Sequence, residues 1–424
     1  MAGSDGSRAR TSPARTRADD VAVTGLGLVS AAGIGAEETW QRVTTTTSPS
    51  HVGPHENLRD LPCDFAYTVA GLDIDRWMDV AASRVLAPFA RFAVVAAHQA
   101  VTDAGLDPEA WEGGRVAVVI GSSHGGITYH DEQQRVLAER GPRRVAPSMA
   151  SAITVNSAAG AVCRALGATG PGLGISTACA SGTDAIGTGL QLLRAGVCDV
   201  AVVGGAEAPC SRPLIASGCQ MRAMSRRRDE PAAAMRPFDA DRDGFVVGEG
   251  AGLLVLERGD HARARGAAPR AWLRGYAATN DAHSPVAPSP EGEGLEQALR
   301  SALRAADVAP AEVGHVNAHG TSTVLNDTIE SAVLHRVCGE GPLVTSTKAM
   351  TGHTLGASGG IETALTVLAL QHRSVPPTVN LEALDPRIAV EVVAKEARPA
   401  RLECAVKTSS GFGGHNAALV LTTA

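Results

Sequence analysis

The chain has 424 residues, of which 44% are hydrophobic and only 3% aromatic, and its formal net charge is −6. A chain of this length and apolar content can bury a large core, so we expect a globular protein of two or three domain-sized units. The small acidic excess gives no overall electrostatic reason to bind nucleic acid. No apolar run reaches the roughly 18 residues that a membrane-spanning helix needs, and residues 1–20 lack the apolar segment of a secretory signal. We therefore expect a cytoplasmic protein that neither enters a membrane nor binds nucleic acid.

The eight cysteines form no Cys-x-x-Cys pair and lie mostly among apolar or small residues. This pattern is typical of reduced thiols in a large domain rather than of a disulfide framework or a zinc site. His315 and His319 are four residues apart, a spacing that places two metal ligands together on a helix. Because their surroundings are strand-like, we predict no metal site.

The first residues of the chain predict no folded structure. Residues 1–20 have almost nothing apolar to bury, so we predict a disordered tail. Order begins with the strand-like run Val21–Val29. Its Gly25-Leu-Gly27 lacks the third glycine of a dinucleotide-binding fingerprint, and we predict a tight glycine turn there instead.

From residue 82 onward, helical and strand-like patterns alternate. Apolar residues recur with helical period over 82–104, and 116–120 is a continuous apolar run typical of a buried parallel strand. The alternation continues with strand-like runs and helical patterns at 175–178, 181–195, 200–204, 251–256, 271–277, 294–306 and 315–318. We predict an α/β fold with mostly parallel central strands covered by helices on both faces. Similar element order after Val21 and after Ala271 suggests an internal duplication.

Cys179 lies in the stretch 173–182, Leu-Gly-Ile-Ser-Thr-Ala-Cys-Ala-Ser-Gly. Helical periodicity begins at Ser181, so the thiol is predicted where a strand passes into a helix. Unpaired N–H groups and the positive end of the helix dipole would favour the nucleophilic thiolate there. The small neighbours leave room for a substrate. A buried cysteine without a chemical role is the alternative that the local sequence leaves open.

Three further stretches could meet this cysteine. His319 ends a short apolar strand at a polar glycine turn, and strand ends facing a crevice are where α/β proteins bind ligands. Lys348 and His353 lie among small residues between another strand-like run and a helix predicted from Ile361 onward. Residues 408–416 form a glycine-rich turn that can direct N–H groups at an anion. Ordinary turns, without function, remain the alternative for each stretch.

Taken together, these stretches resemble the β-ketoacyl-[acyl-carrier-protein] synthases, the condensing enzymes of the thiolase fold. The similarity runs from about Val21 to Leu421 and includes five motifs in family order: STACASG at 176–182, RPFDADRDGFVVGEGAG at 236–252, NAHGTST at 317–323, STKAMTGHTLGASG at 346–359 and GFGGHN at 411–416. The MRAMS segment that begins at Met221 is similar to the stand-alone synthase II branch.

The resemblance implies a thiolase-like fold of two duplicated βαβαβαββ halves that form a five-layered αβαβα sandwich. We expect an N-terminal half at 21–265, which carries the cysteine, and a C-terminal half at 266–424, which carries the histidines, the lysine and the gating loop. It also implies a homodimer, or a heterodimer with a ketosynthase-like paralogue.

The resemblance also implies catalytic roles. Cys179 would accept an acyl chain from a carrier-protein thioester. His319 and His353 would hydrogen-bond the thioester oxygen of a malonyl unit as it loses carbon dioxide. Lys348 would balance the charge of the site, with Glu330 as its acidic partner. The backbone N–H groups of Cys179 and Phe412 would form an oxyanion hole, and Phe412 would gate the second substrate.

The remaining implied roles concern the substrate and its carrier. No cofactor is expected to be bound, because the substrates arrive on the 4'-phosphopantetheine of an acyl carrier protein. Thr321 and Thr323 match residues that line the pantetheine arm, and His124 and Ser410 match the acyl tunnel. Cations that would dock the acidic carrier protein are Arg84, Arg143, Arg144 and Arg222.

Departures from the family pattern concern the substrate rather than the catalytic set. Thr408 and Ser410 replace the usual asparagine and first phenylalanine of the C-terminal motif, and His124 stands where relatives often carry an aliphatic residue. The sequence therefore predicts decarboxylative condensation in type II fatty-acid synthesis or, somewhat favoured, in specialised polyketide synthesis. A non-elongating acyltransferase of the same fold is an alternative. A chain-length-factor-like partner subunit is another, although such subunits typically lack the cysteine.

Overall fold

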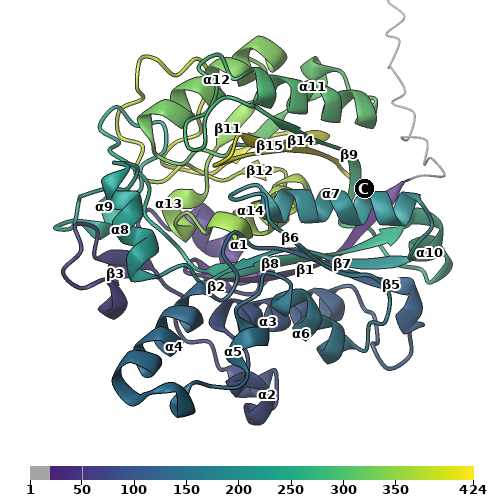
Figure 1. The fold of residues 1–424 in the computed structure, drawn as a ribbon. Coiled ribbons are helices and arrows are strands. Elements are labelled where there is room, and N and C mark those ends of the chain that lie inside the picture. The colour runs from purple at the N-terminus through teal and green to yellow at the C-terminus, as the bar shows by residue number, and fades with distance from the viewer. Residues whose placement is uncertain (1–19, 50) are drawn as a thin grey trace, which may run out of the picture.

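The fold was analysed in a computed structural model, of which residues 20–49 and 51–424 are described (Figure 1). The predicted tail, residues 1–20, lies outside the described residues except for Asp20.

Ten strands follow one another across an 11-stranded sheet, in the order β11-β10-β14-β15-β9-β1-β8-β7-β5-β6, with β2 paired to β1 at one side. The N-terminal half supplies β1 (Val21–Ser30), β5 (Val116–Gly121), β6 (Gly172–Ile175), β7 (Val200–Glu207) and β8 (Gly250–Arg258). The C-terminal half supplies β9 (Ala271–Asn280), β10 (His315–Asn317), β11 (Leu343–Thr345), β14 (Cys404–Gly411) and β15 (His415–Thr422). Within each half the strands lie in the same spatial order, third, second, fourth, fifth and first, which is the duplication suggested by the sequence.

The prediction of mostly parallel central strands is wrong. Strands β5, β6 and β7 are parallel to one another, and so are β10, β11 and β14. Strand β8, however, is antiparallel to β7 and β1, and β15 is antiparallel to β14 and β9. The short turn between β14 and β15 permits only an antiparallel pair. Continuous apolar runs such as that of β8 reflect burial on both faces and do not reveal strand direction.

Helices divide this sheet into layers (Figure 1). Helices α11 (Glu293–Ala306) and α12 (Val324–Cys338) cover the outer side of the C-terminal half, and α3 (Pro88–Asp103) and α6 (Ser157–Leu166) cover the outer side of the N-terminal half. Between the halves lie α7 (Ser181–Arg194) and α14 (Ser358–His372). The five-layered αβαβα arrangement implied by the resemblance is therefore confirmed.

The predicted helix over 82–104 is two helices in the structure. A short helix, α2 (Val80–Arg84), is followed by α3, which begins at Pro88. Proline is favoured in the first turn of a helix and disfavoured in its interior, so one helix ends before Pro88 and a new one begins there. The predicted helices at 181–195 and 294–306 correspond to α7 and α11.

The other elements are short and surround these layers: β2 (Gly33–Ile34), α1 (Ala36–Thr45), β3 (Val52–Pro54), β4 (Phe65–Tyr67), α4 (Ile127–Arg140), α5 (Met149–Ala152), α8 (Arg212–Gln220), α9 (Pro231–Ala234), α10 (Gly259–Ala264), α13 (Lys348–Thr351), β12 (Ser374–Val375) and β13 (Arg398–Pro399). Single-turn 3-10 helices are η1 (Glu56–Leu58), η2 (Ile74–Arg76), η3 (Gly113–Arg115), η4 (Pro142–Arg144), η5 (Pro310–Glu312) and η6 (Leu355–Ala357). No helix among the described residues combines the length and the apolar character needed to cross a membrane.

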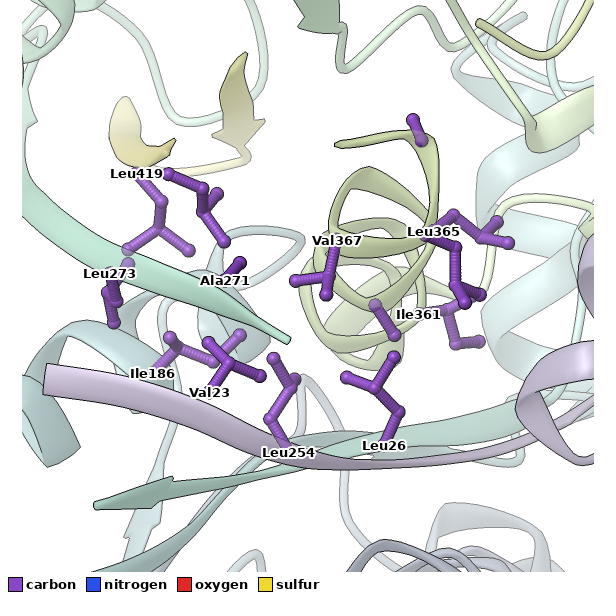
Figure 2. Packing of buried hydrophobic residues seen from close by; sticks show 14 of the residues in the cluster. Val23, Leu26, Ile186, Leu254, Ala271, Leu273, Ile361, Leu365, Val367 and Leu419 are labelled. Atoms are coloured by element: carbon purple, nitrogen blue, oxygen red, sulfur yellow. The ribbon is translucent and has the colours of Figure 1, made fainter. Parts of the chain in front are cut away.

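Helix α14 forms the centre of the core. All its residues from Ser358 to Leu370 are buried. Figure 2 shows Ile361, Leu365 and Val367 of this helix in one cluster with Leu26 and Leu254, which lie below the helix, and with Leu273 and Leu419, which lie to its left. The two halves are therefore held together around one helix that is buried on every face.

Leu365→Ala should lower the free energy of unfolding by about 3 kcal/mol, because it leaves a cavity in the closely packed middle layer. The matched control is Leu137→Ala in α4, where the leucine is 43% exposed. We expect that variant to lose less than about 1 kcal/mol. Urea denaturation of both variants gives the comparison, and equal losses would contradict this account of the core.

Candidate active site

Cys179 lies on a sharp turn between β6 and α7. Ala178 adopts a left-handed conformation with φ 51°, unusual for a residue with a side chain. Its carbonyl accepts hydrogen bonds from the hydroxyls of Ser123 at 2.9 Å and Ser181 at 2.6 Å. The turn is thereby fixed, and it places Cys179 two residues before the start of α7, as predicted.

The state of the thiol differs from the sequence-based expectation. Burial raises the pKa of Cys179 to about 12, and the charge of Lys348 opposes that shift. The side chain is only 8% exposed. Desolvation of a thiolate thus outweighs the favourable position before the helix, and the resting group is a thiol at neutral pH. The prediction that this position favours the thiolate is wrong for the resting site.

His319 and His353 form a pair of buried imidazoles. Their ring centroids are 5.4 Å apart in an edge-to-face arrangement, and the ring of Phe245 lies 5.3 Å from that of His353. His319 follows β10. The backbone N–H of His353 donates to the carbonyl of Val246 at 2.8 Å, and its Nδ1 lies 3.2 Å from the hydroxyl of Ser358.

Both histidines are neutral at physiological pH. Burial, followed by the charge of Lys348, holds the pKa of each well below the ordinary value of 6.5, and Lys407 acts in the same direction. Desolvation penalises the charged imidazolium, and a nearby ammonium repels it. Each ring therefore carries one proton and offers one N–H donor.

Lys348 lies at the start of α13, fully buried. Its Nζ donates to the carbonyl of His319 at 2.5 Å and forms an ion pair with Glu362 of α14. The prediction that Glu330 is the acidic partner of Lys348 is wrong. No ion pair joins the two residues within the described part of the chain. The Glu330 carboxylate instead accepts from the N–H groups of His319 at 2.7 Å and Gly320 at 2.8 Å, and from the Thr408 hydroxyl at 2.7 Å. These donors hold Glu330 against the backbone and away from the lysine.

One cavity of about 870 Å³ brings the predicted residues together. It is lined by Cys179, His319 and His353. Other predicted site residues that line it are Thr321, Thr323, His124, Ser410, Phe412 and Arg222. Arg84 in α2 and Arg143 and Arg144 in η4 are exposed but do not line this cavity. The hydroxyls of Thr321 and Thr323 are 2.9 Å apart.

The glycine-rich turn after β14 crosses directly over the cysteine. A Cβ added to Gly411 would lie 2.9 Å from the backbone nitrogen of Cys179 and the carbonyl of Thr177, so only glycine fits there. The next residue, Phe412, is 40% exposed at the cavity. The turn thus places Phe412 at the cavity that Cys179 also lines.

Sequence reasoning missed two charged residues behind the cavity, Glu362 and Lys407. Lys407 in β14 lies with its Nζ 2.8 Å from Glu362 Oε2. Both side chains are fully or almost fully buried. A single charged residue within an otherwise apolar or small-residue element is the signal that could have found each of them, because such a residue is buried only with a partner.

Two family models match most of the chain: Beta-ketoacyl synthase, N-terminal domain, over residues 18–262, and Beta-ketoacyl synthase, C-terminal domain, over residues 270–382. Among curated relatives, 3-oxoacyl-[acyl-carrier-protein] synthase 2 of Synechocystis sp. is 39% identical over 404 residues, covering 94% of this chain and 97% of the relative. The enzyme of the same name from Staphylococcus aureus is 38% identical over 403 residues, with coverage of 94% and 97%.

Solved structures agree with this. A beta-ketoacyl synthase from Burkholderia phymatum superposes with a TM-score of 0.89 at 32% identity, covering 96% of this chain and 99% of the other. The ishigamide ketosynthase/chain length factor gives a TM-score of 0.87 at 32% identity, again covering 96% and 99%. With matches to both family domains, close relatives along nearly its whole length and a cavity that joins the cysteine to both histidines, the chain belongs to the beta-ketoacyl synthase family.

Proposed function

We propose that this protein is a 3-oxoacyl-[acyl-carrier-protein] synthase that joins an acyl chain held on Cys179 to a malonyl unit, in fatty-acid or polyketide synthesis. The observation that carries the proposal is the shared cavity: one buried thiol faces the same space as two neutral imidazoles whose rings are 5.4 Å apart. A nucleophile next to two hydrogen-bond donors suits acyl transfer followed by stabilisation of an enolate.

In the loading step, the sulfur of Cys179 attacks the carbonyl carbon of an acyl-carrier thioester. A new carbon–sulfur bond forms, the bond to the pantetheine sulfur breaks, and the thiol proton passes to the departing pantetheine thiolate. Because the resting thiol has a pKa of about 12, this proton must leave as the sulfur attacks. The N–H groups of Cys179 and Phe412 stabilise the oxyanion of the tetrahedral intermediate.

In the condensation step, the bond between the malonyl α-carbon and its carboxylate breaks and carbon dioxide departs. The electron pair of the broken bond forms an enolate, and its oxygen accepts hydrogen bonds from the N–H groups of His319 and His353. The α-carbon then attacks the acyl carbonyl on Cys179, a carbon–carbon bond forms, and the cysteine sulfur leaves as a thiolate, which takes up a proton from solvent to restore the resting thiol. The Ser358 hydroxyl, 3.2 Å from His353 Nδ1, can donate to that nitrogen, and in this arrangement the ring proton lies on Nε2.

We propose that the acyl chain carries oxygen atoms near its thioester end, as in a polyketide. His124 supports this proposal, because it lines the cavity and its Nδ1 is buried with no partner among the described residues. Burial lowers its pKa, so the ring is neutral. Glu207 fixes the loop that carries it by accepting from the N–H groups of Ser123 at 2.6 Å and His124 at 3.2 Å. Another polar wall group, Ser410, donates to Asn416 at 2.8 Å. A similar fold with a TM-score of 0.86 belongs to a type II PKS ketosynthase bound to a hexaketide.

The substrates would arrive on the phosphopantetheine arm of an acyl carrier protein, with Arg222 at the cavity as the first docking cation. That same solved structure contains an acyl-carrier protein in complex with its ketosynthase. We propose Arg84, Arg143 and Arg144 as more distant contacts of the same acidic partner. Strand β6 ends the sheet, and its Leu173 is 37% exposed, which supports pairing with a second ketosynthase-like subunit at this edge.

Replacing the nucleophile and the histidines should separate the two steps. Cys179→Ala should lose both acyl loading and elongation. His319→Ala or His353→Ala should still load the acyl chain but condense it at least 100-fold more slowly, about the cost of losing one preorganised donor to a developing oxyanion. Intact-protein mass spectrometry measures loading, and release of labelled carbon dioxide measures condensation. Cys163→Ala and His130→Ala, at a half-buried cysteine and a half-buried histidine, are the controls. Elongation by Cys179→Ala would refute the proposed nucleophile.

The raised pKa of Cys179 predicts an unusual pH dependence of alkylation. The rate of iodoacetamide attack on this residue should keep rising, about tenfold per pH unit, between pH 7 and 10, because the thiolate fraction stays below saturation throughout that range. Peptide mass spectrometry measures the rate, and free glutathione, which levels off near its own pKa, is the reference. A plateau near pH 7 would instead reveal a thiolate in the resting enzyme.

Substitution of His124 tests the acyl class. The wild-type protein should favour a β-keto or β-hydroxy acyl chain over a saturated chain of equal length in kcat/KM. His124→Leu should reduce that preference by roughly tenfold, the worth of one hydrogen bond in a buried site. Activity with the saturated chain serves as the internal control. An unchanged preference would remove His124 from the substrate contacts.

A further inference from the structure

Lys407 lies close to the site but outside the cavity in which loading and condensation would take place. The chain contains three lysines, Lys348, Lys395 and Lys407. Two of them, Lys348 and Lys407, are fully buried, and both contact the same carboxylate. A lysine in the middle of a buried strand is costly unless its charge is compensated. Its placement therefore calls for a physical reason.

The carboxylate of Glu362 bridges the two ammonium groups. Its Oε1 pairs with Lys348, and its Oε2 lies 2.8 Å from the Nζ of Lys407. Lys407 also donates to the carbonyl of Thr408 and, at 3.2 Å, to the hydroxyl of Ser409. That hydroxyl lies 2.7 Å from the hydroxyl of Thr183 in α7, the helix that follows Cys179. Lys407 in β14 thus contacts Glu362 of α14 directly and Thr183 of α7 through the hydroxyl of Ser409.

Lys407 compensates one of the two carboxylates that lie closest to Lys348 and His319, while the buried Glu207 on the Cys179 side is held by N–H and hydroxyl donors of its own. The cluster contains two carboxylates, Glu330 and Glu362, and two ammonium groups, Lys348 and Lys407. The nearby buried Asp327 has its own partner, Arg242, at 3.3 Å. Without Lys407 the cluster would hold an excess negative charge next to the space where the condensation creates an enolate. In a buried site such a charge acts at close range with little screening.

We propose that Lys407 is a positioning residue of the condensation step: it shares Glu362 with Lys348, orients Lys348 toward His319, and supplies the second positive charge that offsets Glu330 and Glu362 beside the developing enolate. This inference rests on the proposed function of the same site. Lys407 does not line the cavity, so it acts through Lys348 and the two histidines rather than by touching the substrate.

The same arrangement gives a measurable pH effect. The positive charges of Lys348 and Lys407 both lower the pKa of His319 and His353, after burial as the main cause. Removing Lys407 allows each ring to bind a proton at a higher pH, and a protonated pair would repel Lys348 and disturb the donor geometry. The acidic limb of the pH profile should therefore move upward. The pKa of Lys407 itself is lowered by burial, with Glu362 opposing that shift.

The test uses Lys407→Met in the full chain, compared with Lys395→Met at the exposed third lysine. We expect Lys407→Met to load an acyl chain on Cys179 within about twofold of wild type. Release of carbon dioxide from the malonyl carrier should fall about tenfold or more in kcat with little change in KM, and the acidic limb should rise by about one pH unit. Lys407→Arg should recover part of both effects, and Lys395→Met should match wild type.

Several results would overturn the inference. An unchanged kcat and pH profile in Lys407→Met would remove the residue from the mechanism. Equal losses of loading and condensation, with a lower thermal unfolding midpoint and no shift of the pH limb, would show a purely structural role. Failure of the proposed function is separable, because the wild-type protein would then release no carbon dioxide from a malonyl carrier at all.

Discussion

The site depends on the direct backbone contact between the first turns of α7 and α14. A Cβ on Gly359 would lie 2.3 Å from the backbone nitrogen of Thr183, and one on Gly182 would lie 2.8 Å from the carbonyl of Gly356. Helices approach this closely only where glycine removes the side chain. The contact joins the segment that carries Cys179, from the N-terminal half, to the segment that carries His353, from the C-terminal half. One cavity with residues from both duplicated halves follows from it.

Deep burial then determines the chemistry of this cavity. Charges persist there only as pairs, which explains why Lys348 and Lys407 share Glu362 and why Glu330 is occupied by backbone N–H groups. The same burial keeps His319 and His353 neutral and the Cys179 sulfur protonated at rest. Neutral donors suit an enolate better than free cations would, since their N–H groups are fixed before the charge appears.

The parts of the cavity that differ from the family pattern lie on its walls and not at its reacting atoms. His124 and Ser410, polar where the resemblance implies apolar side chains, line this cavity together with the cysteine and both histidines. The proposed effect of such a wall is on which acyl chain binds and not on the bond-making steps. The similarity of the sequence to 3-oxoacyl-[acyl-carrier-protein] synthases and of the fold to ketosynthases, one of them of a type II PKS, fits a common reaction with variable chains.

The sequence by itself determined the alternation of elements, suggested the duplication and, through five motifs that resemble the family, pointed to the candidate site residues, because helical periodicity and short motifs are local properties. It predicted Cys179, His319, Lys348 and His353 without any coordinates. Three features were decided only by tertiary structure: the antiparallel placement of β8 and β15, the choice of Glu362 rather than Glu330 as the partner of Lys348, and the protonated state of Cys179. Strand direction, ion pairing and desolvation all depend on which distant segments become neighbours and how much water they exclude, and neither is encoded in the spacing of residues along the chain.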